Sequence, residues 1–349
     1  MNTTIGLLLL QDGLTSGFIY ALLALSILLV FVVTRVLWVP AGDFLVFGAL
    51  TLALLQQGQV PGTVWLCAAL GITTAIIETW RAWRYNDWRD WRLVLAISLG
   101  TPLVIGGLIY LLAASKPALA IQVLLTLALI VPMGFMLYRV AFRPLADKSV
   151  LILMFVAIAV HYTLVGLGLV FFGSEGYRTP PFITGRIDAG FTRISWQLVL
   201  VIATSGMFMF ALWFFMGRTL WGKALRATAV NRFGARLAGI RTETMGALTF
   251  SVAALIGAFS GILIGPVTTL FYDSGFLISL KGFVGAVIAG MASFPVAVLG
   301  AIVVGIVESF SSFYASAFKE AIVFALLIPF LLWRSAVEPR SHEAHEQDE

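Results

Sequence analysis

Long hydrophobic runs dominate this chain and limit what it can fold into. The first extends from Gly13 to Val33 without a charged residue. A helix that crosses a hydrocarbon core of about 30 Å needs about 20 predominantly apolar residues, so this run is long enough to span a membrane. Within lipid, backbone polar groups must be hydrogen-bonded inside the protein, which favours helices. Comparable runs recur along the chain, and the sequence therefore predicts an all-α, polytopic integral membrane protein.

Composition supports the same fold class. Hydrophobic residues make up 60% of the 349 residues and charged residues 11%, against roughly 25% charged residues in ordinary soluble domains. We expect about nine to eleven transmembrane helices in a single transmembrane domain over residues 1–337, followed by a disordered cytoplasmic tail over residues 338–349. Breaks near residues 36–55 and 276–333 would also fit re-entrant segments. A single cysteine, Cys67, excludes an internal disulfide.

One polar stretch between two hydrophobic runs carries a concentrated positive charge. It extends from Arg218 to Arg241 and contains six cationic residues and no acid: Arg218, Lys223, Arg226, Arg232, Arg236 and Arg241. Apolar residues recur in it at spacings of three and four, which predicts one amphipathic helix: Val230, Phe233, Leu237 and Ile240. Gly239 followed by Ile240 is typical of a helix C-terminus. An ordinary orienting loop needs no ordered apolar face, so we interpret the stretch as a docking helix for a partner.

The run GKALRATAVNRFGARLAGI within this stretch resembles the cytoplasmic coupling loop of ABC-importer permeases, in particular the branched-chain amino-acid permease family. In that family the loop inserts into a cleft on a separate ATPase subunit. The resemblance implies that matching small and basic residues belong to the ATPase contact: Ala224, Arg226, Ala227 and Gly239. We add to this expected docking set the neighbouring residues Leu225, Phe233, Arg236 and Leu237.

A helix break is predicted shortly after the first hydrophobic run. Pro40 and Gly42 interrupt the pattern, and Asp43 would be costly at bilayer depth unless it faces protein or water. Members of the resembled family carry an Asn-Phe-Ala-His-Gly pattern here, of which this chain keeps the glycine and the acid that follows. Pro40, Gly42 and Asp43 are therefore candidates for a broken helix along the substrate pathway. An interfacial turn with Trp38 and Asp43 at the headgroups is the alternative.

The segment from Lys281 to Ser309 also resembles the family, with Pro295, Gly300, Gly305 and Glu308 at corresponding places. Small residues and a proline would let two short helices meet inside the membrane and expose backbone groups to a polar path. We therefore place Gly290, Ser293 and Pro295 in the candidate substrate pathway. Tight helix packing without a ligand contact is the alternative.

Residues 60–116 are not explained by the resemblance. Two hydrophobic segments flank a linker, Trp80 to Arg92, that contains four arginines and four tryptophans. This combination suits the headgroup region of a membrane, where arginine binds lipid phosphates, and does not indicate nucleic-acid binding. We interpret the region as an insertion of two further spans. Farther along, His161 lies in an uncharged run with no carboxylate at helical spacing, which favours a neutral packed histidine over a proton relay.

Charge distribution predicts the orientation in the membrane. Most of the 22 lysines and arginines lie in loops on one side, together with the 218–241 stretch. The positive-inside rule then places the N-terminus outside and the C-terminus in the cytoplasm. The polar loop over residues 173–193 would face outward, where a periplasmic substrate-binding protein delivers solute.

The sequence contains no phosphate-binding loop of the G-x-x-x-x-G-K-[ST] type, no nucleophile–base pair and no metal-ligand cluster. We expect no enzyme activity and no cofactor bound by this chain, with ATP hydrolysed by partner subunits. The expected partners are a second permease subunit in a heterodimer, two cytoplasmic ATPase subunits, the periplasmic binding protein and membrane lipid.

The leading hypothesis is an inner-membrane permease subunit that imports branched-chain amino acids or a related small hydrophobic or amide-bearing solute. An ion-driven secondary transporter is the first alternative and would need paired carboxylates within the membrane, for which Asp43 and Glu308 are the candidates. A non-transporting membrane scaffold is the second. It would keep its function when the docking face is disrupted.

Overall fold

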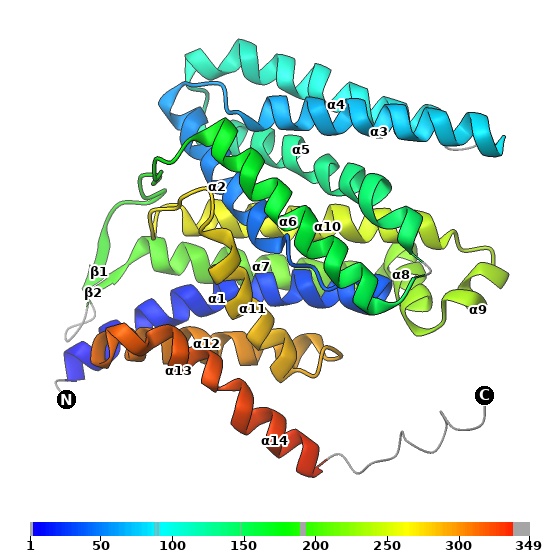
Figure 1. Ribbon diagram of the computed structural model, residues 1–349. Helices are drawn as coiled ribbons and strands as arrows, with labels where there is room; N and C mark the ends of the chain where they lie inside the picture. Colours follow the sequence, from blue (N-terminus) through cyan, green and yellow to red (C-terminus); the bar gives the residue numbers. More distant parts are fainter. Residues whose placement is uncertain (1–2, 87, 89–90, 147, 189–192, 338–349) are drawn as a thin grey trace.

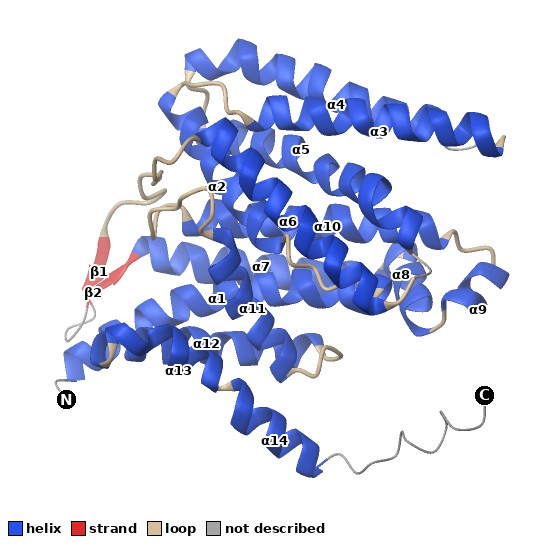
Figure 2. Ribbon diagram, viewed as in Figure 1, coloured by secondary structure: helices blue, strands red, loops and turns tan. Residues whose placement is uncertain are grey.

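The computed structural model describes residues 3–86, 88, 91–146, 148–188 and 193–337, and nearly all of them lie in helices (Figure 1, Figure 2). The predicted tail over 338–349 lies outside the described residues. The helices are α1 Thr3–Thr34, α2 Ala41–Gln57, α3 Thr63–Tyr85, α4 Trp91–Leu112, α5 Leu119–Leu137, α6 Val150–Phe172, α7 Trp196–Arg218, α8 Leu220–Val230, α9 Arg232–Leu237, α10 Thr242–Ile264, α11 Gly275–Ile288, α12 Phe294–Tyr314, α13 Lys319–Ala325 and α14 Leu327–Val337.

Eight described helical segments are long and apolar enough to cross a membrane. The helices α2 and α11 are apolar but shorter, in the two regions where the sequence indicated breaks. The all-α, polytopic prediction is confirmed. A small antiparallel hairpin of β1 Arg186–Asp188 and β2 Arg193–Ser195, which the sequence pattern did not indicate, lies in the polar segment before α7.

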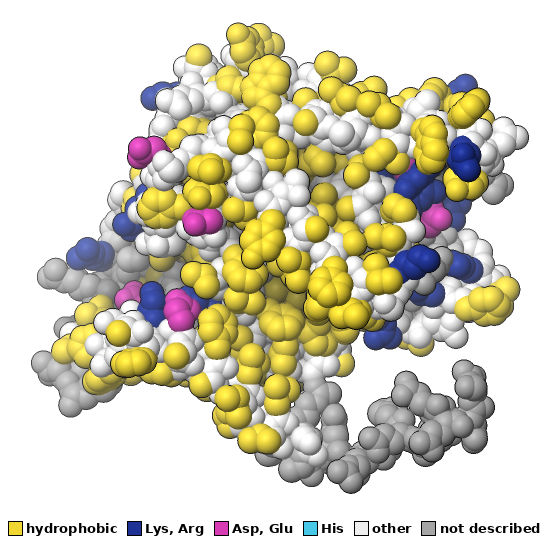
Figure 3. Space-filling view, in the orientation of Figure 1, with side chains coloured by type: hydrophobic (Ala, Val, Ile, Leu, Met, Phe, Trp, Pro, Cys, Tyr) yellow, Lys and Arg dark blue, Asp and Glu magenta, His cyan; other side chains and the backbone are white. Residues whose placement is uncertain are grey.

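The centre of the bundle is formed by α1, α2 and α10. From Ala41 to Leu55 every residue of α2 is buried, and α2 packs along α10 while α1 contacts α10, α11 and α12. In contrast, α4, α6 and α7 are buried over only a small part of their length. Figure 3 shows hydrophobic side chains across the middle of one face, where α6 lies in front. The interior is thus filled by helices that are buried on nearly all sides. The helices of the outer layer leave apolar side chains exposed for lipid or for another subunit.

Close packing of α1 against α12 depends on small residues. A Cβ atom on Gly13 would lie 2.7 Å from the Ile306 Cα, and one on Gly17 would lie 2.8 Å from the Ile302 Cα. Gly305 of α12 approaches the same stretch of α1 from the other side. Small residues at such a spacing let two backbones approach within a membrane. Gly13 and Gly17 thus provide the space for the contact between α1 and α12.

The bundle has two different ends. At one end, called the basic end below, lie the C-termini of α1 and α3, residues 138–146 and the α8–α9 segment (Figure 1). At the opposite end lie the first turns of α1, the β-hairpin and the C-terminus of α12. The Trp/Arg region, predicted as a linker, is partly helical, because α3 continues to Tyr85. Its tryptophans Trp80, Trp83 and Trp88 are exposed, as a headgroup contact requires.

The last hydrophobic segment is not one continuous helix. It is divided into α13 and α14. At the start of α13, Glu320 accepts a hydrogen bond from the buried Lys281 of α11 at 3.2 Å. Lys281 also donates to Glu308 of α12, whose other oxygen accepts from the Tyr20 hydroxyl at 2.6 Å. This buried cluster joins α1, α11, α12 and α13.

We predict that Gly17→Ala destabilises the protein by about 1–3 kcal/mol, because the added methyl group overpacks the α1–α12 contact. The measurement is thermal unfolding of the detergent-solubilised protein. The matched control is Gly206→Ala in α7, where a Cβ would meet nothing within 4 Å and where alanine should stabilise the helix by about 0.5–1 kcal/mol. Equal effects at the two positions would contradict the close approach.

Candidate functional site

The predicted docking stretch forms two short helices and not one. The first, α8, begins after Thr219, whose hydroxyl accepts a hydrogen bond from the Gly222 nitrogen at 3.0 Å. The second, α9, begins after Asn231, whose side chain accepts from the Gly234 nitrogen at 2.9 Å. Side-chain oxygens of Thr and Asn are typical N-caps. The helical spacing across residue 231 was therefore misleading, because Asn231 caps a new helix.

Gly239 ends α9 as predicted. Its φ of 81° lies in the left-handed region that glycine adopts without strain. The Ile240 nitrogen donates to the Ala235 carbonyl at 2.9 Å and the Gly239 nitrogen to the Arg236 carbonyl at 3.0 Å. These bonds satisfy carbonyl groups at the helix C-terminus. The turn directs the chain into α10.

Six of the eight predicted docking residues are exposed, whereas Ala224 and Leu225 are not. Leu225 is fully buried and packs into the core, so it holds α8 in place and does not belong to the exposed surface. Ala224 is half-buried, and the other predicted residues are exposed: Arg226, Ala227, Phe233, Arg236, Leu237 and Gly239. An open groove of ≈ 580 Å³ lies between α8 and α9, lined by Lys223, Arg226 and Val230 among others. Val230, Phe233 and Leu237 expose 87%, 71% and 75% of their surface.

The chain breaks between α1 and α2, as the sequence predicted. After α1 ends at Thr34 the backbone is not helical until α2 begins at Ala41. Trp38 in this segment is 1% exposed and lies against Phe44 and Phe250. This burial contradicts the alternative interpretation, in which Trp38 and Asp43 lie among headgroups. Non-helical backbone at this depth is tolerated because protein surrounds it.

Asp43 lies in the first turn of α2 and is 2% exposed. Its carboxylate oxygens are 2.9 and 3.0 Å from the Nδ1 of His161 in α6. The His161 ring stacks on Phe276 of α11, with ring centroids 5.0 Å apart. His161 is thus packed in the interior, as the sequence indicated, and it has a carboxylate partner from a different helix, which spacing along its own helix could not reveal. A negative side chain in the first turn is also favoured by the helix dipole.

A mostly apolar cavity of ≈ 270 Å³ adjoins this pair. It lies between α1, the 36–39 segment, α6 and α11, and its walls include Ile27, Trp38, Ile158, His161, Ser279 and Phe283. The cavity can hold a small apolar group beside a histidine and a hydroxyl, which is typical of ligand pockets.

The six residues predicted along the substrate pathway do not form one site. Gly42 packs against Gly275 and Ser279 at the beginning of α11, beside Pro40 and Asp43. Gly290, Ser293 and Pro295 lie beyond the other end of α11, in the turn to α12 and its first residues. At about 1.5 Å per residue, α11 separates the two groups by about 20 Å. Gly290 and Met291 both have positive φ in this tight turn.

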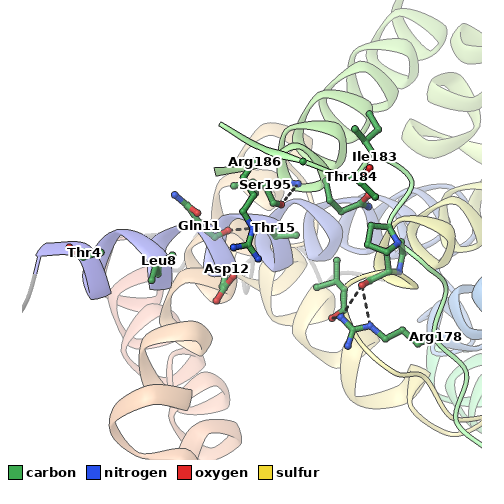
Figure 4. A pocket seen from close by; sticks show the side chains of 16 residues that line it. Thr4, Leu8, Gln11, Asp12, Thr15, Arg178, Ile183, Thr184, Arg186 and Ser195 are labelled. Carbon is green, nitrogen blue, oxygen red and sulfur yellow. Dashed lines mark hydrogen bonds between the residues drawn. The ribbon is translucent and has the colours of Figure 1, made fainter. Parts of the chain in front are cut away.

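A large open cleft of ≈ 1340 Å³ lies at the opposite end of the bundle. Figure 4 shows that its lining comes from the first turns of α1, with Gln11, Asp12 and Thr15, and from the polar segment that contains Thr184, Arg186 and Ser195. Arg178 donates to the carbonyls of Pro266 and Val267 at 3.1 Å. It thereby fixes the polar segment to the chain that follows α10.

A comparison with known protein families assigns this chain to a family. Residues 93–331 match the family model described as the branched-chain amino acid transport system permease component. The chain belongs to this permease family. The matched range includes the docking segment, the cavity residues of α6 and α11, and the α11–α12 turn. It begins within the second of the two helices that we interpreted as an insertion.

Several relatives of the permease carry the same description. It is 31% identical over 208 residues to the high-affinity branched-chain amino acid transport system permease protein BraD of Pseudomonas aeruginosa, covering 58% of this chain and 68% of that protein. It is 34% identical over 211 residues to LivH of Escherichia coli K12, covering 57% and 67%. A probable LivH of Methanocaldococcus jannaschii is 27% identical over 213 residues, covering 58% and 65%. No solved structure matches.

Three interactions of this permease could not be found from spacing along the chain. They are Asp43 with His161, Lys281 with Glu308 and Glu320, and Glu78 with Arg143. Each joins residues from different helices. A charged or titratable side chain within a hydrophobic run was the only available signal, because such a side chain requires a partner. That signal identified Asp43 but not which residue it binds.

We predict that Asp43→Ala destabilises the permease by about 1–3 kcal/mol, because it leaves the buried ring nitrogen of His161 without its hydrogen-bond partner. The double variant Asp43→Ala/His161→Leu should recover part of this loss, since it removes both polar groups. Thermal unfolding of the purified protein measures both effects. Additive destabilisation in the double variant would contradict a direct interaction between the two side chains.

Proposed function

We propose that this permease is the membrane-spanning subunit of an ATP-driven importer for branched-chain amino acids or a related small hydrophobic or amide-bearing solute. Its relatives carry names that specify branched-chain amino acid transport. The α8–α9 segment is the docking site for a separate ATPase, and the binding of ATP and its hydrolysis occur on that partner. The chain itself binds no cofactor.

The observation that carries this proposal is the surface of α8 and α9. The exposed Val230 lines a groove together with the cations Lys223 and Arg226, and Phe233 and Leu237 are exposed on the adjoining helix α9. Single exposed apolar side chains are common on protein surfaces. Several of them beside a groove, on an ordered segment whose helices are capped, indicate a contact surface for another protein. The buried Leu225 and the two N-caps make the segment rigid enough to transmit movement.

The cavity beside Asp43 and His161 is our candidate for the solute path. Its volume of ≈ 270 Å³ and its aliphatic and aromatic walls suit a branched aliphatic side chain, whose burial contributes about 1.5–3 kcal/mol. The broken segment before α2 lines it, in keeping with irregular backbone beside transport paths. Gly290, Ser293 and Pro295 then serve the turn between α11 and α12, away from this cavity.

The proposed orientation has the basic end in the cytoplasm and the N-terminus outside. The large cleft of Figure 4 then faces the periplasm and is the entrance to which a substrate-binding protein delivers solute. The apolar outer faces of the bundle leave room for a second permease subunit, in a heterodimer that binds two ATPase subunits in the inner membrane.

An ion-driven transporter is less well supported. Its two candidate carboxylates already have partners, since Asp43 binds His161 and Glu308 binds Lys281 and Tyr20. The family match also favours an importer subunit. A scaffold without transport would not need the cavity or the docking groove.

We predict that Arg226→Glu combined with Phe233→Asp releases the ATPase and abolishes uptake while membrane insertion stays normal. The change reverses one charge and places a carboxylate in the apolar part of the contact, where an unpaired charge is costly. Co-purification of the ATPase in mild detergent and uptake of labelled leucine are the measurements. Lys148→Glu, an exposed charge reversal at the same end, is the control and should leave both unchanged. Normal uptake in the double variant would refute the proposal.

The orientation is tested by labelling. Cys67, which is fully buried, is first replaced by alanine, and a cysteine is then placed at Thr184 or at Phe233, both exposed. A membrane-impermeant maleimide should label Thr184→Cys in intact cells and Phe233→Cys only after the membrane is opened, because the two sites lie at opposite ends of the bundle. Labelling of Phe233→Cys in intact cells would reverse the assigned orientation.

A further inference from the structure

A buried carboxylate in α3 has no part in the function described so far. Glu78, whose side chain is 8% exposed, faces three arginines. Both of its oxygens accept from Arg143 Nη1 at 2.8 Å, and Arg81 and Arg139 approach within 3.4 and 3.6 Å. Charge-assisted hydrogen bonds of this kind are stronger than neutral ones, and burial protects them from screening by salt.

Arg143 connects this carboxylate to the docking region. Its Nε donates to Glu243 Oε2 at 2.7 Å, and Glu243 lies in the first turn of α10, directly after the docking stretch. A planar guanidinium can bind two carboxylates at once from different edges, which a lysine cannot do with the same geometry. One side chain therefore joins α3, in the outer hairpin, to the beginning of α10, in the centre of the bundle.

The loop that carries Arg143 also contacts the docking segment directly. Arg232, the first residue of α9, donates from Nη1 to the Ala146 carbonyl at 2.8 Å. On the other side of the loop, Arg81 of α3 donates to the Arg139 carbonyl at 3.2 Å. Residues Tyr138–Phe142 form a π-helical turn, a geometry that is rare and recurs at functional sites. The 138–146 loop thus contacts α3, α9 and α10 through charged side chains.

We propose that Glu78 is a positioning residue that holds Arg143 in place, and with it the junction between α9 and α10, so that movement of the docking segment reaches the membrane helices. The α3–α4 hairpin, whose role the family resemblance left open, is in this view a brace for the docking end. This inference rests on the proposed ATPase docking, because without a docked ATPase there is no movement to transmit.

The experiment uses the permease assembled with its ATPase and binding protein in liposomes and measures labelled leucine taken up per ATP hydrolysed. Glu78→Gln keeps the shape of the side chain but removes its charge. We expect at least about a fivefold loss of uptake per ATP, the lower range of energetic coupling between sites, with the ATPase still bound. The matched control is Asp273→Asn, an exposed carboxylate between α10 and α11 that does not line the cleft, and it should leave the ratio unchanged.

Glu243→Gln tests the same connection from its exposed side, since this side chain is 53% exposed and its loss should not prevent folding. Because both carboxylates bind one guanidinium, the effects of Glu78→Gln and Glu243→Gln on the ratio should not add. A Glu78→Gln complex that forms in smaller amounts but keeps its uptake per ATP would show a purely structural role and overturn the inference. So would additive effects, or a normal ratio in Glu243→Gln. A wild-type permease that binds no ATPase would instead contradict the proposed function.

Discussion

Satisfaction of backbone hydrogen bonds within lipid is the constraint on which this structure depends. It explains why nearly every described hydrophobic run is helical, and why the non-helical segment between α1 and α2 is enclosed by protein. Enclosure requires close neighbours, and Gly42 of α2 and Gly275 of α11, whose backbones lie against each other, provide the space for them. The entirely buried α2 can then begin inside the bundle, with Asp43 in its first turn paired to a histidine of α6. The break, the pair and the adjacent cavity follow from one packing arrangement.

Much of the fold could be predicted because hydrophobic length is a local property. The spans, the break near Pro40 and the turn at Gly239 all correspond to patterns within short stretches of sequence. The predictions were incomplete where the contact that determines the structure joins residues far apart in the sequence. Spacing predicted one docking helix, but Asn231 caps a second, and Leu225 is an anchor because of the core beneath it. Spacing along its own helix offered His161 no carboxylate, because its partner Asp43 is 118 residues away. Charge and hydrophobicity identify which residues need a partner, and only the three-dimensional arrangement identifies the partner.

The proposed solute path and the proposed docking segment are connected through the same central helices. Leu225 anchors α8 in the core near α1 and α10, and α1 and α11 both contribute to the cavity wall. A displacement of α8 would thus act on helices that line the cavity, without a separate relay. Because the interior is closely packed, such helices move between discrete arrangements and do not deform continuously. This favours an alternation between two states over a gradual opening.

The lysine within α11 also has a consequence for how the chain enters the membrane during synthesis. Lys281 binds Glu308 and Glu320, which are made after it. A lysine at the centre of a lone helix opposes insertion by about 2.5–3.5 kcal/mol, and α11 is short. Stable integration of α11 therefore has to wait for α12 and α13, so the C-terminal part of the permease should enter the bilayer as a unit. Ribosomes that stop before Glu308 would leave α11 dependent on an insertion chaperone.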